Sequence, residues 1–104
     1  NWSEPYRLAE RLNTDPPNTG IYRIWYEGQE STVAYIGESG NISSRLYNHE
    51  QTFGEKALFA YAERSDLNAS HKREEIETDL IGTYYLEFGE APLAQFGHTE
   101  NLPL

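Results

Sequence analysis

The chain contains no cysteine and few positively charged residues. Without cysteine, neither a disulfide framework nor a thiolate zinc site can form. No apolar run approaches the roughly 18 residues of a membrane span, and no signal-peptide core is visible. We therefore expect no membrane insertion and a cytoplasmic location. The 104 residues suffice for one hydrophobic core and not for two, so we expect a single domain over 1–104.

The scarcity of positive charge bears on possible partners. Eight basic residues stand against 17 acidic ones, which gives a net charge of −9. This balance opposes nucleic-acid binding, because most of that binding energy comes from the neutralisation of phosphates by Lys and Arg. The conflict disappears if the acidic residues lie away from a local basic cleft, or if the protein works in high salt, since the Debye length is roughly 3 Å at 1 M. Many acidic residues with few lysines suggest a halophilic source.

The first predicted element is a short helix over residues 3–13. Ser3 can cap this helix, Pro5 fits its first turn, and Leu8 and Leu12 form an i, i+4 apolar pair. The two prolines and the glycine in "TDPPNTG" then break the chain.

Two strands are predicted next, at 20–27 and 32–38, with a hairpin connection at Gly28. Both faces of the first strand are largely apolar, which predicts that it is covered on both sides. The remaining elements are a helix over 41–50 with Ser39 or Asn41 near its start, a strand over 57–63, a helix over 70–88 and a tail over 96–104.

Four apolar residues at a spacing of four define the core side of the last helix: Ile76, Leu80, Tyr84 and Phe88. The predicted order is therefore α-β-β-α-β-α. It indicates an α+β fold in which helices flank a small, three-stranded antiparallel sheet.

Few single residues point to chemistry by themselves. Arg45 and His49 lie four apart and share a helix face, but alone they are most simply a surface pair. Glu77 lies beside the apolar stripe among other acids, and Tyr22 and Tyr35 are most simply core aromatics.

Their order along the chain is more specific. The tripeptides Gly20-Ile21-Tyr22 and Tyr35-Ile36-Gly37 are followed by Ser39, Asn41, Arg45, His49 and Glu77, the last within "ETDLI". This series resembles the GIY-YIG nuclease family, which includes the N-terminal nuclease of the bacterial excision-repair incision subunit and phage intron homing endonucleases. The resemblance runs from Gly20 to about Gln95, with Pro92 and Gln95 similar to the residues that close the family domain.

The resemblance implies a set of residue roles. Tyr22, Tyr35, Arg45, His49 and Glu77 would be catalytic, with Glu77 the single protein ligand of one Mg²⁺ or Mn²⁺ ion. Mg²⁺ commonly keeps several waters and takes only one or two carboxylates, so one glutamate is sufficient. A planar guanidinium at Arg45 suits two phosphate oxygens. The resemblance also assigns substrate binding to three residues near the second tripeptide: Gly37, Ser39 and Asn41.

The general base stays open between two residues. A free tyrosine near pKa 10 is a poor base at neutral pH, whereas histidine near 6.5 is a suitable acceptor. Tyr35 and His49 are therefore both candidates, with Tyr22 orienting the phosphate or the water. Many relatives have lysine after the second tripeptide, where this chain has Glu38, and this favours His49 slightly.

The expected function is a metal-dependent DNA endonuclease that hydrolyses phosphodiester bonds with an activated water. The alternative is a catalytically weak or inactive GIY-YIG domain that binds nucleic acid or protein. Target choice is expected to come from a homo-oligomer, or from an additional recognition domain or subunit.

Overall fold

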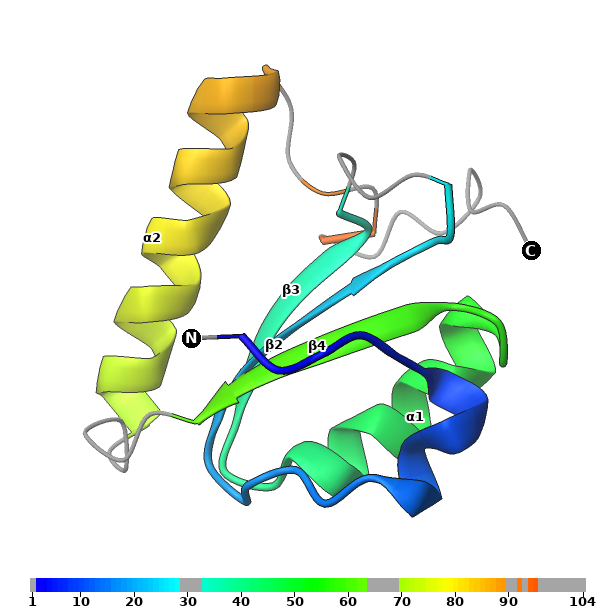
Figure 1. Cartoon of the computed structure of the whole chain (residues 1–104). Coiled ribbons are helices and arrows are strands. Elements are labelled where there is room, and N and C mark those ends of the chain that lie inside the picture. Colours follow the sequence, from blue (N-terminus) through cyan, green and yellow to red (C-terminus); the bar gives the residue numbers. More distant parts are fainter. Residues whose placement is uncertain (1, 29–32, 64–69, 90–91, 93, 96–104) are drawn as a thin grey trace.

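The computed structural model describes residues 2–28, 33–63, 70–89, 92 and 94–95. It is an α+β fold, as predicted, in which the strands form one sheet and the helices pack around it (Figure 1). The elements in chain order are strand β1 (Tyr6–Arg7), 3-10 helix η1 (Leu8–Asn13), strands β2 (Gly20–Trp25) and β3 (Tyr35–Ser39), helix α1 (Ile42–Phe53), strand β4 (Leu58–Glu63) and helix α2 (Ser70–Phe88).

The strands form one antiparallel sheet in the order β1-β4-β2-β3. Strand β2 is central and pairs with β3 on one side and β4 on the other. In this register Tyr22 lies opposite Gly37 of β3 and Tyr61 of β4. The two tripeptides noted in the sequence therefore meet at the Tyr22–Gly37 pair.

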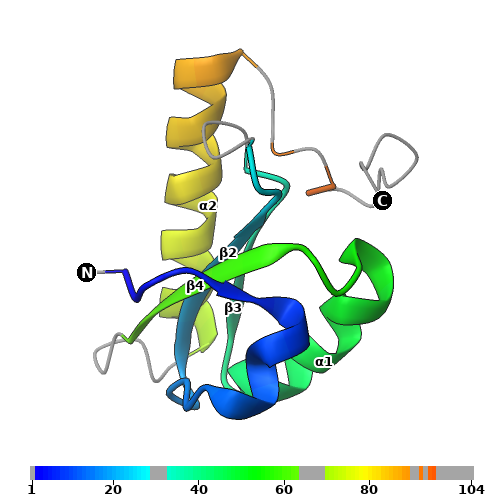
Figure 2. The same ribbon diagram turned by 45° about the vertical axis from the view of Figure 1, so that its right-hand side comes forward.

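Helices cover the sheet on both faces. Figures 1 and 2 show α1 and η1 on one side of the sheet and α2 on the other. Tyr22 and Ile24 belong to the core beneath α1, whereas Ile21 packs with residues of α2. Five of the six residues of β2 are buried, so the prediction that this strand is covered on both sides is confirmed.

The predicted helix over 3–13 is wrong in its first half, and the described sheet has four strands rather than three. Tyr6 and Arg7 form β1 and pair with β4. The backbone N–H of Leu8 then donates to the Ala57 carbonyl at 2.8 Å, and only the residues from Leu8 onward are helical. Pairing with an open sheet edge satisfies backbone groups that a short, isolated helix would leave to water, so tertiary structure overrides the local pattern.

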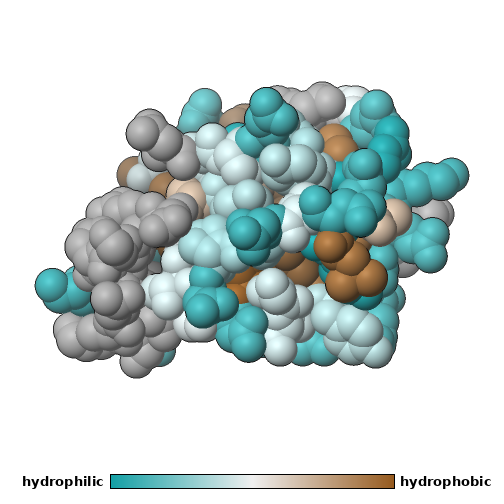
Figure 3. Space-filling view, turned by 60° about the horizontal axis from the view of Figure 1, so that its bottom comes forward, coloured by the Kyte–Doolittle hydropathy of each residue, from teal (hydrophilic) through white to brown (hydrophobic). Residues whose placement is uncertain are grey.

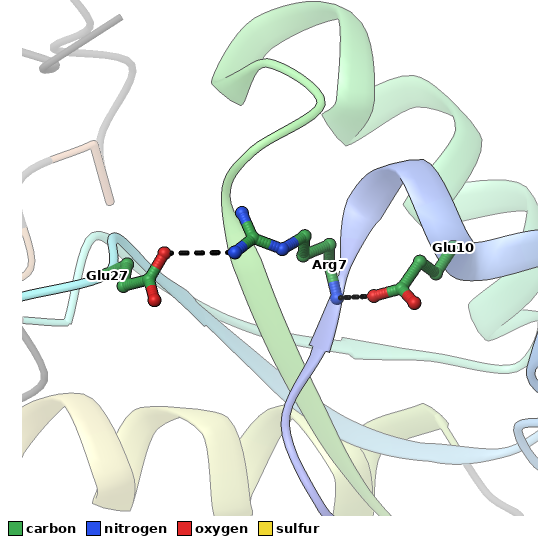
Figure 4. A network of polar contacts seen from close by, with 3 residues as sticks. All are labelled: Arg7, Glu10 and Glu27. Atoms are coloured by element: carbon green, nitrogen blue, oxygen red, sulfur yellow. Dashed lines mark hydrogen bonds and ion pairs between the residues drawn. The ribbon is translucent and has the colours of Figure 1, made fainter.

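Arg7 connects β1 to its surroundings in two ways (Figure 4). Its backbone N–H donates to the Glu10 carboxylate at 3.2 Å, and its guanidinium binds Glu27 at 3.1 Å. Both partners of the ion pair are exposed, so the pair contributes little to stability. The N-terminal segment is therefore held mainly by its sheet pairing and by Leu8, which is fully buried.

Helix α1 begins and ends with clear capping residues. The Asn41 side chain accepts a hydrogen bond from the backbone N–H of Ser44, and Gly54, at φ 88°, ends the helix. The helix therefore reaches Phe53, one turn beyond the predicted end at residue 50. The extra turn matters for the site, because Phe53 packs against Tyr35 and His49.

Helix α2 spans the residues that the sequence predicted, but its apolar stripe is only partly covered. Tyr84 is buried, whereas Phe88 is 43% exposed. Neither described helix is long and apolar enough to cross a membrane. The face formed by α1 and η1 is largely hydrophilic with small hydrophobic areas (Figure 3). The start of the predicted second strand, at Thr32, and the tail over 96–104 lie outside the described residues.

Candidate active site

Gly37 leaves room for the phenol of Tyr22. A Cβ at position 37 would lie 2.5 Å from the Tyr22 Cζ and Oη atoms and 2.8 Å from a ring carbon of Tyr35. At Gly20 a Cβ would collide with the carbonyl oxygen of Ala62. Both tripeptide glycines are therefore required by packing in this structure: one lets β2 approach β4, and the other admits a tyrosine ring beneath β3.

This packing predicts a large effect of Gly37→Ala on stability. The added methyl must displace a fully buried tyrosine, so we expect the free energy of unfolding to fall by about 2–3 kcal/mol. Gly82→Ala is the matched control, because nothing lies within 4 Å of its Cβ position in α2, and it should gain about 0.5–1 kcal/mol. Urea denaturation measures both values. Equal effects of the two substitutions would contradict the packing argument.

The Tyr22 hydroxyl joins Arg45 to His49. The Nε–H of Arg45 donates to Tyr22 Oη at 3.4 Å, and Tyr22 Oη lies 2.7 Å from His49 Nε2. Because Tyr22 accepts from Arg45, its own proton is available to His49 Nε2. This arrangement implies the His49 tautomer that carries its proton on Nδ1.

Tyr35 completes the cluster from β3. Its ring centroid lies 4.8 Å from that of His49 and 6.2 Å from that of Tyr22. The hydrogen bond with Tyr22 raises the pKa of the Arg45 guanidinium, and the nearby Tyr35 phenol adds to this effect. Tyr22 and His49 are buried, Tyr35 is half-buried and Arg45 is exposed. Arg45 and Tyr35 are therefore the members of the cluster that a substrate can reach.

Burial sets the protonation states of Tyr22 and His49. It raises the pKa of Tyr22 well above its ordinary value, against the opposing effect of the hydrogen bond with Arg45. Burial and the nearby Arg45 charge lower the pKa of His49 to about 4. At neutral pH, Tyr22 is therefore a neutral phenol and His49 a neutral imidazole that can accept a proton.

The lowered pKa of His49 predicts that stability depends on pH. Because the folded pKa lies below the unfolded value near 6.5, His49 favours unfolding as it is protonated. Its effect is absent above pH 7, grows as the pH falls through 6.5 and reaches about 3 kcal/mol of lost stability near pH 4. Denaturation of wild type and His49→Gln between pH 7 and 4 measures this loss. A constant difference between the two proteins over that range would contradict the prediction.

Glu77 approaches the cluster from α2. Burial and the Glu38 charge raise its pKa, whereas a backbone hydrogen bond from Glu38 and the Arg45 charge act in the opposite direction. The Glu77 charge in turn contributes to the raised pKa of Tyr22. The Glu77 carboxylate therefore lies next to the β3 backbone and within electrostatic reach of Arg45 and Tyr22.

The chemistry of these groups fits a divalent cation. Glu77 is half-buried and lies close enough to Glu38 for their charges to repel. A bound cation would offset both the repulsion and the burial cost. Within the described residues no three His, Asp or Glu side chains converge, so a cation here would keep several waters, as Mg²⁺ commonly does.

Ser39 and Asn41 have structural partners at the turn into α1. Ser39 Oγ accepts from the Asn41 backbone N–H at 2.8 Å, and the Asn41 side chain caps the helix.

Gln95 forms a two-bond clamp on the edge of β3: its amide oxygen accepts from the Ile36 N–H at 2.8 Å, and its amide nitrogen donates to the Ile36 carbonyl at 2.7 Å. The clamp fixes the strand that carries Tyr35 and Gly37.

Sequence reasoning did not identify Arg23 or the position of Glu38. Both follow from strand alternation, because odd-numbered residues of β2 and their partners on β3 face α2. Among the predicted catalytic residues, Tyr22, Tyr35, Arg45 and His49 form direct contacts. Glu77, by contrast, lies within electrostatic reach of Arg45 and Tyr22. No model of a known protein family matches this chain, and no curated protein matches its sequence.

Proposed function

We propose that this chain is a metal-dependent DNA endonuclease of the GIY-YIG type, which hydrolyses phosphodiester bonds with an activated water. One observation carries the proposal: a guanidinium, an imidazole and two phenols from β2, β3 and α1 are in contact, and a carboxylate from α2 lies within electrostatic reach of Arg45 and Tyr22. These are the residue types and the chain order on which the resemblance rests.

Arg45 is the group proposed to bind the scissile phosphate. The hydrogen bond from its Nε to Tyr22 orients the guanidinium and leaves its other N–H groups for phosphate oxygens. A fixed positive charge at this point would stabilise the charge that develops on the phosphate in the transition state.

Tyr35 is the residue proposed to contact the attacking water. The Nε2 atom of His49 is already engaged by Tyr22, and both of these residues are buried. Tyr35 is half-buried, so its hydroxyl can meet a water near the phosphate that Arg45 would bind. In this assignment, Tyr22 and His49 position Arg45 rather than touch the substrate.

Glu77 is the residue proposed to hold the metal ion. When bound, a divalent cation supplies Lewis-acid stabilisation of a phosphate or leaving oxygen. The Glu38 backbone favours the charged form of the Glu77 carboxylate, which is the form that binds a cation.

Binding without catalysis is the second candidate function. The Glu38 carboxylate beside Glu77 counts against cleavage at this point and leaves binding through other residues, because a second negative charge there opposes the approach of a phosphate. The net charge of −9 acts in the same direction in low salt.

A nuclease assay separates the two candidates. The purified chain is incubated with plasmid, single-stranded and branched DNA, with Mg²⁺ or Mn²⁺, from low to molar salt. We expect cleavage that needs the metal and stops with EDTA. DNA binding without cleavage under every condition would support the binding module instead.

Replacement of Tyr35 tests the assignment of the water-contacting residue. We expect Tyr35→Phe to lower the single-turnover cleavage rate about 10²-fold, because general-base catalysis is typically worth that much or more. His49→Gln can keep a hydrogen bond to Tyr22 and should cost less. A larger loss in His49→Gln than in Tyr35→Phe would make His49 the base.

A further inference from the structure

A pocket of about 290 Å³ lies between the C-terminal half of α2 and the sheet face opposite Tyr22. Its walls include Trp2, Ile36, Tyr84 and Phe88, and its polar groups include Arg23. A second hollow of similar size shares Trp2 and extends toward the N-terminal half of α2. The sheet face under α2 is therefore grooved rather than filled.

Arg23 packs against aromatic rings, and its buried Nε has no polar partner among the described residues. Its Cζ atom lies 4.6 Å from the ring centre of Trp2 and 5.2 Å from that of Trp25. Within the described residues, the buried Nε of Arg23 and the buried Nε1 of Trp25 have no hydrogen-bond partner. A guanidinium that faces indole rings offers its N–H groups in its own plane, which suits a ligand with two neighbouring acceptors. Buried donors of this kind are rarely left unpaired.

The Glu87 carboxylate adds a hydrogen-bond acceptor to the donors that Arg23 brings to the pocket. It lines the same pocket as Arg23, and the described residues contain no ion pair between the two. The charges of Arg23 and Glu87 cancel, so a free anion would meet attraction and repulsion together. A flat, neutral ligand with both acceptors and donors on its edges fits better.

We propose that this pocket binds a single unpaired nucleobase, with guanine preferred. Guanine O6 and N7 are two adjacent acceptors that pair with arginine, and amino groups of bases donate to glutamate. Phe88, which is 43% exposed and whose ring centre lies 4.5 Å from that of Tyr84, supplies apolar surface for stacking.

The pocket shares helix α2 with the proposed metal ligand, Glu77. Tyr84 is seven residues beyond Glu77 on α2, which corresponds to about 10 Å along the helix axis. A nucleotide close to the scissile phosphate could therefore reach it. The inference rests on the proposed function only in that a DNA strand supplies the base.

Intrinsic fluorescence tests the pocket directly, because the chain has only two tryptophans and both contact Arg23. The wild-type chain is titrated in EDTA with dGMP, dAMP, dCMP, TMP and inorganic phosphate, and with short single strands that contain or lack one guanine. We expect dGMP and the guanine-containing strand to change the fluorescence at about tenfold lower concentration than the other ligands. An equal response to phosphate alone would overturn the proposal, as would no response.

Three substitutions complete the test, each checked by circular dichroism for folding. Arg23→Met should abolish the response to dGMP, whereas Arg7→Met, at an exposed arginine on β1 that does not line the pocket, should keep it. Glu87→Gln should keep binding but reduce the preference for guanine. This variant provides the test if Arg23→Met does not fold. An unchanged preference in Glu87→Gln, or an unchanged response in folded Arg23→Met, would overturn the proposal. Because no cleavage is measured, failure here is distinct from failure of the nuclease assay.

Discussion

Glu77→Gln is expected to lower the cleavage rate by about 10³-fold while the protein stays folded. The substitution keeps the size of the side chain but removes the negative charge that would hold a divalent cation. Burial and the Glu38 charge already disfavour a negative charge at this position. Removal of the Glu77 charge should therefore leave the free energy of unfolding unchanged or slightly higher. Single-turnover cleavage and Mn²⁺ binding followed by electron paramagnetic resonance measure the two effects.

The matched control for Glu77 is Glu75→Gln, at an exposed position on the same helix. It removes the same charge from the acidic surface and should leave both cleavage and Mn²⁺ binding unchanged. Loss of cleavage with Mn²⁺ binding retained in Glu77→Gln would move the metal to other residues. Cleavage that survives Glu77→Gln at the wild-type rate would show that Glu77 holds no catalytic ion.

Arg45→Ala should have an effect of similar size on cleavage. Removal of a fixed charge that stabilises a transition state typically costs 10²–10³-fold in rate, and here we expect about 10³. Arg45→Lys keeps the charge but loses the planar donors, so it should recover at most about tenfold. Single-turnover rates at saturating DNA report these losses.

Arg7→Ala is the control for Arg45, because its exposed ion pair with Glu27 lies away from the cluster. It removes one positive charge from a strongly acidic chain and should change cleavage little in high salt. If both arginine variants lose activity equally, the effect would come from net charge rather than from a guanidinium in the site.

Much of the fold follows from the sequence because local and tertiary preferences agree. The bounds of α2 were predicted correctly, since serine is common at helix starts and the apolar stripe continues unbroken to Phe88. Strand β2 was also recognised, because its apolar residues on both faces require cover on both sides.

The N-terminal region could not be predicted because long-range pairing decides it. The Leu8 and Leu12 pattern favours a helix, yet Leu12 is 82% exposed and the chain before Leu8 joins the sheet edge. Only the position of β4, far along the sequence, makes that edge available. The extra turn of α1 was missed for a simpler reason, since Gly54 ends the helix and residue 50 carries no stop signal.

The candidate site was predicted as a set of residues but not as a network. Chain order indicated Tyr22, Arg45 and His49, whereas their hydrogen bonds depend on how α1 packs over β2. The role of Gly37 as the space for the Tyr22 phenol is likewise a property of strand register. Spacing along one chain carries no information about such cross-strand contacts.

The central claim is that these side chains act as one hydrolytic unit, and a double substitution tests it most directly. Residues of one catalytic unit show strongly non-additive losses. We predict that Arg45→Ala with Glu77→Gln cleaves DNA about as slowly as either single variant. Losses that multiply would indicate independent roles, and wild-type cleavage in the double variant would contradict the account.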